Sequence, residues 1–576
     1  MKKDLLVKKM YYSMLQPTLI TNLVISVAAF SDSMILGNFL GESALSALAF
    51  VMPVFMLMNI FIIMIAGGGA VAVSIENGKG NKEMADKHFS MTLIMAVAVG
   101  VIFSTVCLVF MDPLIYLLGA RGEMISLVKE YLTIFVSIVV LFFLCGSLQL
   151  SVRNAGRPKL CMVATLTFIV MNIVLGIGFV GFTNMGIAGA AWGMMIAELT
   201  SLLVVASHFF TKKNHMRFTF NINLTSFLTI VKNGGGTSTT YIYKFFTILV
   251  FNNIIMGVAG VPGMVVYSVI TNISSIALSI FEGLSQTIQP MVSTYVGEKN
   301  NSGIQDIMKL ATKSALVLCG GTIVLLEIFP QAIARIFGIT DAVIVASATE
   351  GIRIYSMCMI FTCFNAMMGY YYQFIQRQKI TILLIAVREL VVLVPCVIVL
   401  SSLWGLNGIW LGFVITEVIA MATWLMMAKV ISKKSLGKLS SVLLLDKERD
   451  EKVLVLSILA EEAEVFKAIK EADAFLQSHH VDGKRRNRLI LSIEEIGMNI
   501  VTHNQEAKNK IIEIQISLGD EIDLIIRDNC KTFDPTQWDG QKNAQPTNLG
   551  LMLVKNSANA FEYLPTIGCN RVMLKY

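Results

Sequence analysis

The sequence carries little charge. Only 15% of the 576 residues are charged and 55% are hydrophobic, whereas soluble globular domains are about 25% charged. The mean hydropathy of +0.69 therefore predicts a polytopic α-helical membrane protein. The net charge of +7 comes mostly from Lys and Arg in short segments between apolar runs, so we expect no direct nucleic-acid partner.

The sequence also lacks cysteine and histidine patterns. Its nine cysteines are scattered through apolar segments, and there is neither a CxxC pair nor a His/Cys cluster with zinc spacing. These features exclude a disulfide framework and a zinc site as organising elements. The basic N-terminus precedes a long apolar run without a small-residue cleavage site, which indicates a first span rather than a removed signal peptide.

Apolar runs long enough to cross a bilayer recur along the first three quarters of the chain, and we expect about twelve spans. They lie at 13–36, 45–73, 89–110, 126–150, 160–181, 187–210, 236–258, 263–293, 311–330, 348–373, 380–403 and 406–431. Lys and Arg gather in alternate loops, and the positive-inside rule then places the N-terminus and everything after residue 433 in the cytoplasm of a cell-membrane protein.

Two halves of the apolar region repeat. The segment Arg157-Pro-Lys159 returns 220 residues later as Arg377-Gln-Lys379, and the Gly-rich segment at 186–193 returns at 405–412. We therefore expect two six-span lobes, residues 1–220 and 221–438, related by an axis along the membrane normal. The substrate site would lie between them.

One carboxylate stands out in the first span. Asp32 interrupts an apolar run from Thr18 to Leu36. A charge at that depth costs a few kcal/mol and is usually retained because it faces a cavity and has a function. The sequence thus predicts that Asp32 couples an ion to transport.

These residues resemble the multidrug and toxic compound extrusion (MATE) family across roughly 10–432. The segments that carry the resemblance are Pro17, Phe30 to Gly37, Arg153 to Lys159, Gly186 to Ala191, Gln286 to Pro290 before Gly297, and Gly405 to Gly408. The resemblance implies efflux of drugs or organic cations driven by H⁺ or Na⁺. It also implies that Asp32 is the coupling residue and that Pro17 lets the first helix bend.

One position departs from the family pattern. Relatives often have a second acid just after the segment Asn172 to Leu175, where this chain has Gly176. Other polar groups in the spans are further candidates for ion coupling, and we expect Lys244 or Arg388 to pair with a glutamate. We expect Glu198 and Glu417 near the membrane interfaces. The candidate residues are Asp32, Pro17, Asn172, Glu198, Lys244, Glu282, Gln286 and Arg388.

After residue 438 the composition becomes that of a soluble domain. A strand at 452–458, helices at 461–477 and 482–504, a hairpin at 510–527, a helix at 549–560 and a strand at 571–575 are predicted. Together they indicate an α+β sandwich over residues 445–576.

Polar residues in this domain resemble those of the histidine-kinase-like ATPase (GHKL) fold, in the branch of serine-kinase anti-sigma factors. The resemblance implies that Glu495 is the catalytic acid/base, Asn499 the Mg²⁺ ligand and Asp528, followed by Asn529, the adenine-binding segment. It further implies that residues 536–547 form the nucleotide lid and that Gly550 meets the phosphates of ATP. Cys530 and Asn548 replace glycines that the family prefers.

Three functions follow from these observations. The first is a secondary antiporter with a cytoplasmic nucleotide-binding regulatory domain. The second is a membrane-tethered signalling protein whose tail binds a sigma factor or an anti-anti-sigma-like partner, with possible serine-kinase activity, while the transporter half senses ligand. The third is a flippase for a lipid-linked precursor, which would need a more cationic cavity. Alternatively, Glu495 and Asn499 form a solvated helix face and the tail only docks a protein.

Overall fold

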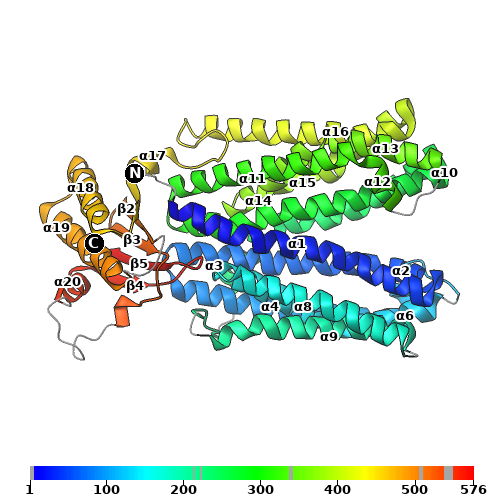
Figure 1. Ribbon diagram of the computed structural model, residues 1–576, viewed down its shortest axis with the longest axis horizontal. Coiled ribbons are helices and arrows are strands. Elements are labelled where there is room, and N and C mark those ends of the chain that lie inside the picture. The colour runs from blue at the N-terminus through cyan, green and yellow to red at the C-terminus, as the bar shows by residue number, and fades with distance from the viewer. Residues whose placement is uncertain are drawn as a thin grey trace.

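A long helical bundle carries a small α+β domain at one end (Figure 1). The computed structural model describes residues 5–122, 124–183, 185–211, 214–220, 223–336, 341–504, 510–537 and 549–576. We call the α+β domain the tail domain, and the end of the bundle that it contacts the tail side.

The first half of the bundle, here the N-lobe, runs from α1 to η3. Its helices are α1 (Leu5–Leu40), α2 (Glu42–Ile62), η1 (Ile63–Gly67), α3 (Gly68–Gly78), α4 (Lys82–Val109), α5 (Met111–Leu117), α6 (Met124–Ser137), α7 (Val139–Asn154), α8 (Pro158–Gly176), η2 (Ile177–Gly181), α9 (Gly186–Ala206) and η3 (Ser207–Phe210). Of these, η1 and η2 are π-helical turns that continue their neighbours.

The second half, here the C-lobe, has fewer and longer helices. They are α10 (Leu224–Gly297), α11 (Asn301–Ile328), α12 (Pro330–Ile336), α13 (Ala342–Ser356), α14 (Met359–Phe374), α15 (Gln378–Ala386), η4 (Val387–Val391) and α16 (Leu393–Lys434). Two of them contain a break: α10 at Gly260 and α16 at Trp404 and Gly405, where the backbone leaves helical angles.

The predicted number of spans agrees with this bundle. Among the described residues, eight helices are long and apolar enough to cross a membrane, and two further pairs form spans bent by 46° and 49°. The 36-residue helix α1 runs along the bundle beside them (Figure 1). With the break at Gly405 dividing the 57-residue stretch from Gln378 to Lys434, the described chain provides twelve crossings.

The backbone repeats between the lobes. Positive φ angles at Gly41, Gly80, Gly156 and Gly186 recur 219 or 220 residues later, and so do the two bends within spans. The recurring positions are Gly260 (58°), Lys299 (59°), Gln376 (62°) and Gly405 (56°). Because left-handed backbone is uncommon, four matched positions confirm the internal repeat that the sequence indicates.

The lobes touch backbone to backbone on the tail side. A Cβ atom at Gly78 would lie 2.1 Å from the carbonyl oxygen of Thr294, and one at Gly297 would lie 2.1 Å from that of Ile75. A second close approach joins Gly68 and Gly234, since a Cβ at Gly68 would lie 2.7 Å from the Gly234 nitrogen. Only glycine permits such spacing, so the tail side of the bundle is closed.

The tail domain is a five-stranded antiparallel sheet covered by helices on one face. In chain order it contains α17 (Lys447–Glu451), β1 (Val453–Leu459), α18 (Glu462–Ser478), α19 (Gly483–His503), β2 (Ile511–Leu518), β3 (Ile522–Asp528), η5 (Pro535–Gln537), α20 (Leu549–Ser557), β4 (Ala560–Tyr563) and β5 (Asn570–Lys575). The strand order is β1-β2-β3-β5-β4.

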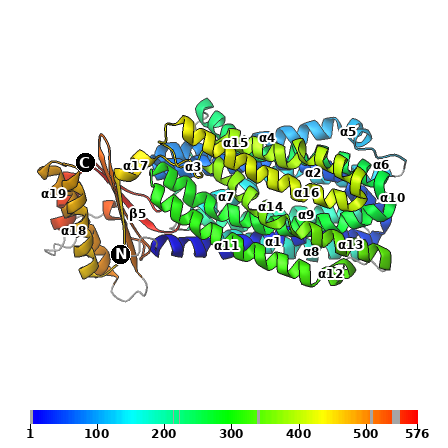
Figure 2. The same cartoon turned by 90° about the horizontal axis from the view of Figure 1, so that it is seen from above.

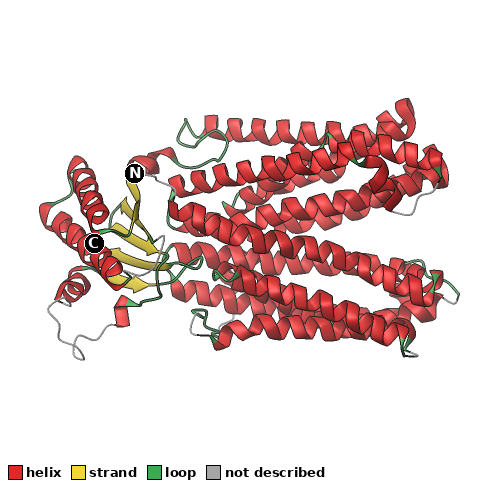
Figure 3. Cartoon of the chain, viewed as in Figure 1, coloured by secondary structure: helices red, strands yellow, loops and turns green. Residues whose placement is uncertain are grey.

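The two faces of this sheet have different neighbours. Its helices lie on the side away from the bundle, and the strands lie between those helices and the bundle (Figures 2 and 3). Leu489, Ile493 and Ile496 of α19 are buried in the core beneath the sheet, as their spacing predicts. The predicted last helix ends at Ser557 rather than Ala560, because Ala560 begins β4, an edge strand that the sequence analysis did not identify.

Candidate functional site

The N-lobe brings Asp32 and Asn172 together. The side-chain amide of Asn172 on α8 donates a hydrogen bond of 2.6 Å to the Asp32 carboxylate on α1. Gly176 lies one turn beyond Asn172, and a Cβ there would be 3.1 Å from the Ile35 side chain. An apolar side chain therefore occupies the place where relatives carry a second acid.

Pro17 lies within the continuous helix α1. Proline has no N–H to donate, so one hydrogen bond of the helix ladder is missing at this turn. The Pro17 carbonyl accepts a 2.8 Å hydrogen bond from the Thr21 hydroxyl. This local geometry permits a bend, and the prediction that α1 bends in function stays a prediction.

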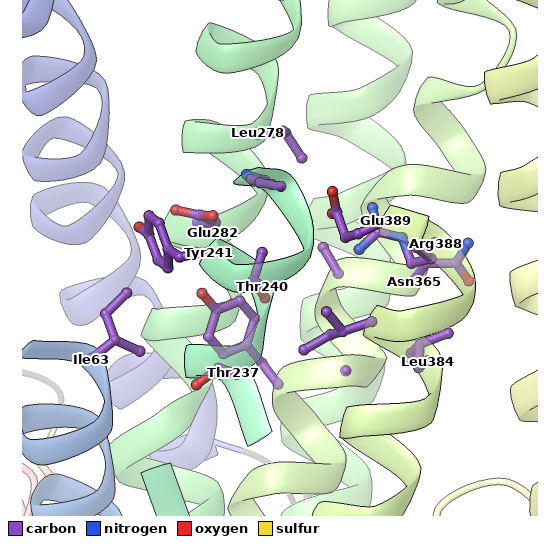
Figure 4. A pocket seen from close by; sticks show the side chains of 15 residues that line it. Ile63, Thr237, Thr240, Tyr241, Leu278, Glu282, Asn365, Leu384, Arg388 and Glu389 are labelled. Carbon is purple, nitrogen blue, oxygen red and sulfur yellow. The ribbon is translucent and has the colours of Figure 1, made fainter. Parts of the chain in front are cut away.

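The C-lobe contains a cavity lined by charged residues (Figure 4). Lys244, Glu282, Arg388 and Glu389 line it together with Tyr241. Its volume of about 50 Å³ has room for an ion with water, whereas drug-sized ligands need several hundred Å³. Three predicted residues, Lys244, Glu282 and Arg388, thus share one site.

Arg388 forms an ion pair at the edge of this cavity. Its guanidinium donates to both Glu417 oxygens, with an Nη2–Oε1 distance of 2.7 Å and an Nε–Oε2 distance of 3.0 Å. Asn365 donates to Glu417 over 2.6 Å, and Trp424 in turn donates to Asn365. The predicted pairing of Arg388 with a glutamate is confirmed.

Glu198 and Glu417, expected near the membrane interfaces, are both buried among the helices of the bundle, and their depth in the membrane stays a prediction. Glu417 is held there by Arg388, while Glu198 packs beside Cys145. Sequence position alone could not show this, because helix packing decides which face of a span meets other helices.

Gln286 of the C-lobe helix α10 contacts the N-lobe. Its side-chain oxygen accepts hydrogen bonds from Arg153 at 2.6 Å and from Asn22 at 3.3 Å. The sequence places Arg153 in a basic loop, but the structure buries it at the end of α7. Arg153 is therefore a polar residue at the lobe interface that sequence reasoning missed.

The tail domain brings together Asn499 and Asp528, two of the residues singled out in its sequence, with His503. Asn499 and His503 of α19 and Asp528 at the end of β3 line one cavity of about 40 Å³. The Asp528 Oδ1 atom accepts hydrogen bonds from the Cys530 backbone N–H at 2.8 Å and the Asn570 side chain at 2.9 Å. Burial raises the pKa of Asp528.

Glu495 lies beside the start of α20. A Cβ atom at Gly550 would be 1.9 Å from the Glu495 carboxyl carbon, so a larger residue at position 550 would displace the Glu495 side chain. Burial and the neighbouring Glu494 raise the pKa of Glu495. Asn529 has a structural contact, since its side-chain oxygen accepts a 2.9 Å hydrogen bond from the Ile511 N–H. Within the predicted lid, residues 538–547 lie outside the described residues, as does Asn548.

These residues fit a nucleotide chemically. The Asn499 side-chain nitrogen is buried without a hydrogen-bond partner, and a buried polar atom of this kind is costly unless something binds it. Asp528 has further acceptor positions for an adenine amino group. Gly550 opens a helix whose free N–H groups suit phosphates. Among the described residues there is no cluster of three His, Cys, Asp or Glu side chains that could hold a metal by itself.

Two family models match the chain. The model described as MatE covers residues 17–177 and 237–398, which is more than half of the sequence. The model described as histidine kinase-like ATPase domain covers residues 458–576, and this match confirms the resemblance of the tail.

Known relatives and structures agree with these matches. The multidrug export protein MepA of Staphylococcus haemolyticus is 24% identical over 430 residues, which are 71% of this chain and 90% of that protein. The probable multidrug resistance protein YoeA of Bacillus subtilis is 26% identical over 208 residues, or 35% of this chain and 45% of that protein.

Among solved structures, a crystal structure of MATE in complex with MaL6 matches 75% of this chain and all of that one, with 22% identity and a TM-score of 0.71. An outward-facing MATE transporter of the MOP superfamily matches 75% of this chain and 99% of that one, with 22% identity and a TM-score of 0.70. The chain is therefore a multi-pass membrane protein that belongs to the MatE family.

Proposed function

We propose that this protein is a secondary antiporter that exports amphipathic or cationic drugs in exchange for H⁺ or Na⁺. The observation that carries the proposal is the hydrogen bond between Asn172 and Asp32, which holds a carboxylate inside the N-lobe. The family match and the multidrug names of the relatives support the substrate class. Residues 1–220 and 221–438 are the proposed lobes, and the tail side is the proposed cytoplasmic side.

The proposed coupling works through the charge of Asp32. A carboxylate within a span binds a proton or a Na⁺ ion because either removes the cost of an unpaired charge. Asn172 donates to the carboxylate and so orients it whether or not the ion is bound. Loading and unloading of Asp32 would then bias the two lobes between states open to opposite sides.

Dye uptake into inside-out vesicles tests this proposal. We expect Asp32→Asn to abolish uptake driven by an ion gradient, because an amide neither releases a proton nor binds Na⁺ well. The matched control is Asp112→Asn, since Asp112 is exposed and paired with Lys129 at the end of the N-lobe. Imposing H⁺ and Na⁺ gradients separately identifies the ion. Unchanged uptake in Asp32→Asn would refute the coupling role.

The C-lobe cavity is a second candidate ion site. Lys244 faces Glu282 and Glu389 there, and Arg388 is paired with Glu417, so two bases are opposed by three acids and the site is not cationic. This charge supports cation antiport over the flippase alternative, which needs a cationic cavity for phosphate groups. Gln286 is outside this cavity's lining and contacts Arg153 instead.

We propose further that the tail domain binds ATP with Mg²⁺ as a regulatory ligand. Asp528 would accept the adenine amino group. The Asn499 side-chain oxygen would bind Mg²⁺, and its unpartnered nitrogen would donate to a phosphate oxygen. The N–H groups near Gly550 would bind the phosphates. Glu495 is placed to hold or move a proton beside the phosphate end. Bound ATP would supply a phosphoryl group, but the described residues support binding more directly than transfer.

Binding of a fluorescent ATP analogue to the full-length protein tests this role. We expect Asp528→Asn and Asn499→Ala each to weaken binding at least tenfold, and Asp473→Asn, an exposed control on α18, to leave it unchanged. Because burial raises the pKa of Asp528, affinity should fall as the pH is lowered toward that pKa and the acceptor becomes protonated. Equal binding by all variants would contradict the proposed site.

The signalling alternative, with a sigma factor or anti-anti-sigma-like partner, stays a prediction. No contact among the described residues favours it over transport.

A further inference from the structure

Four charged side chains are buried where the tail domain meets the bundle. Arg527 of β3 pairs with Glu298, which follows α10, and with Glu513 of β2 at 2.6 Å. Arg571 of β5 pairs with the same Glu298 oxygen at 3.0 Å. Two positive and two negative groups are thus enclosed together, so the cluster is electrically neutral. We call these four residues the interlobe clamp.

Arg571 joins the two lobes directly. Its guanidinium donates to the carbonyl oxygens of Asn77 at 2.8 Å and Gly78 at 2.6 Å, at the end of N-lobe helix α3. A cation suits these carbonyls because they form the negative end of the helix. Through Glu298 the same side chain holds the C-lobe, so one arginine bridges both lobes.

Other contacts place the tail domain across the same junction. On the C-lobe side, Asn300 donates to Gln515 at 2.9 Å, and Gln515 donates to the Glu298 carbonyl. On the N-lobe side, a Cβ at Gly156 would lie 2.0 Å from the Gly568 nitrogen. The sheet therefore rests on loops of both lobes at once.

The contact combines polar and apolar side chains. Beyond the interlobe clamp, the sheet presents Gln515 to the bundle. Ile511, Ile567 and Cys569 of the tail domain are buried in one hydrophobic core with helices of the bundle, and a Cβ at Gly80 would lie 2.7 Å from the Met573 sulfur. The tail domain therefore packs on the bundle through apolar side chains as well as through the four charged ones.

We infer that the tail domain holds the tail side of the transporter closed and so limits its turnover. The interlobe clamp lies directly over the contact of Gly78 with Gly297, where the lobes meet backbone to backbone. Opening the tail side must separate these glycines. Arg571 donates a hydrogen bond to the carbonyl of Gly78 and forms an ion pair with Glu298, the residue after Gly297, so that separation must break its contacts with one lobe or the other.

This inference rests on the proposed transport function, and both are tested with full-length protein in inside-out vesicles. Arg571→Ala removes the bridge from the tail side, and Glu298→Gln removes its anion from the bundle side. We expect each variant to raise the initial rate of dye uptake at least threefold. The double variant should be no faster than the faster single variant, because both act on one contact.

The matched control is Arg486→Ala. Arg486 also pairs with an aspartate, Asp473, but on the helix layer away from the bundle, so its uptake rate should equal that of wild type. Glu298→Gln guards against a folding artefact, since it leaves the sequence of the tail domain intact. Hydrogen–deuterium exchange over residues 76–82 and 568–575 should increase in both clamp variants and not in the control.

The outcomes separate the two proposals. If the wild type takes up dye and both clamp variants take it up at the same rate or more slowly, the inference about the clamp is refuted and the proposed transport function stands. Faster uptake without faster exchange at the contact would also overturn it. If no variant transports under any gradient, the proposed function fails, and the exchange data still decide whether Arg571 holds the domain to both lobes.

Discussion

The two lobes share a backbone and differ in charge. Glu198 and Glu417 lie 219 residues apart at equivalent, buried positions on the last helix of each lobe. Cys145 accompanies the first and Asn365 the second, again at repeat-related positions. In the C-lobe Arg388 neutralises the glutamate, whereas the residue 220 positions earlier is Phe168.

This difference shows which part of a repeat is constrained. Positive φ angles, breaks and bends recur because they set how the helices pack. The buried acid recurs as Glu198 and Glu417, but its cation does not, since Arg388 corresponds to Phe168. Arg388 neutralises Glu417 in the C-lobe, while Asp32 is held by an amide. A buried carboxylate without a built-in cation keeps a charge that a proton or a metal ion can neutralise.

The largest expected effect concerns the C-lobe ion pair. Arg388→Ala leaves Glu417 buried without its partner, which should cost about 3–5 kcal/mol of stability. Replacing both residues with methionine should recover most of this loss. Thermal unfolding in detergent measures it, with Lys129→Ala as an exposed-pair control expected to cost less than about 1 kcal/mol. A small loss in Arg388→Ala would mean that the pair is hydrated.

The next prediction moves the acid between lobes. Asn252 is the repeat counterpart of Asp32, but Val392 replaces Asn172 in the C-lobe. We therefore expect the double variant Asp32→Asn/Asn252→Asp to remain at least tenfold slower in dye uptake than wild type, about 1.4 kcal/mol in barrier. Recovery of transport would show that the lobes are interchangeable and would break the comparison.

Two glycines test the shared backbone. Gly186 and Gly405 have φ angles of 54° and 56°, and a Cβ would meet nothing within 4 Å at the first and only Val258 at 4.0 Å at the second. Alanine should therefore cost about 1 kcal/mol at either site through backbone strain alone. Unfolding of the two variants in detergent measures these costs. Clearly unequal costs would mean that the lobes differ in more than charge.

The smallest effect is expected at Glu198. Because no ion pair is formed by Glu198 within the described residues, Glu198→Gln breaks no ion pair and should change stability by less than about 0.5 kcal/mol. Glu417→Gln at the equivalent position should cost several-fold more, as it leaves Arg388 unpaired. Thermal unfolding of the two variants in detergent measures the stability lost by each. Equal losses would indicate an unrecognised cation beside Glu198.

The sequence was informative wherever a pattern is local or periodic. Apolar run length predicted the spans, a constant offset predicted the repeat, and alternation predicted the hairpin that the structure shows as β2 and β3. Those features follow from rise per residue and helix period, which the sequence states directly.

Features set by distant contacts could not be predicted. From the sequence, Arg153 is a basic residue in a loop, and its burial depends on Gln286 of the other lobe. Likewise, the sequence does not show that Glu417 is paired with Arg388. The extreme case is Arg571, whose partner Asn77 is 494 residues away. In the sequence of β5, Arg571 looks like an ordinary charged residue of a strand. Its burial is explained only by the packing of the tail domain on the bundle.

The pairing of β3 with β5 has one more consequence. Asp528 lies opposite Asn570 and Arg527 opposite Arg571, so successive rungs of one ladder point to opposite sides of the sheet. Asp528 and Asn570 line the cavity under the helices, and the next pair, Arg527 and Arg571, contacts the helical bundle. A slip of a single residue along β5 would turn Arg571 into the helix-covered core and Asn570 toward the bundle, and a slip along β3 would do the same to Arg527 and Asp528. The register of these two strands therefore decides which side chains face the cavity and which face the bundle. A change of register would alter both sets of contacts at once.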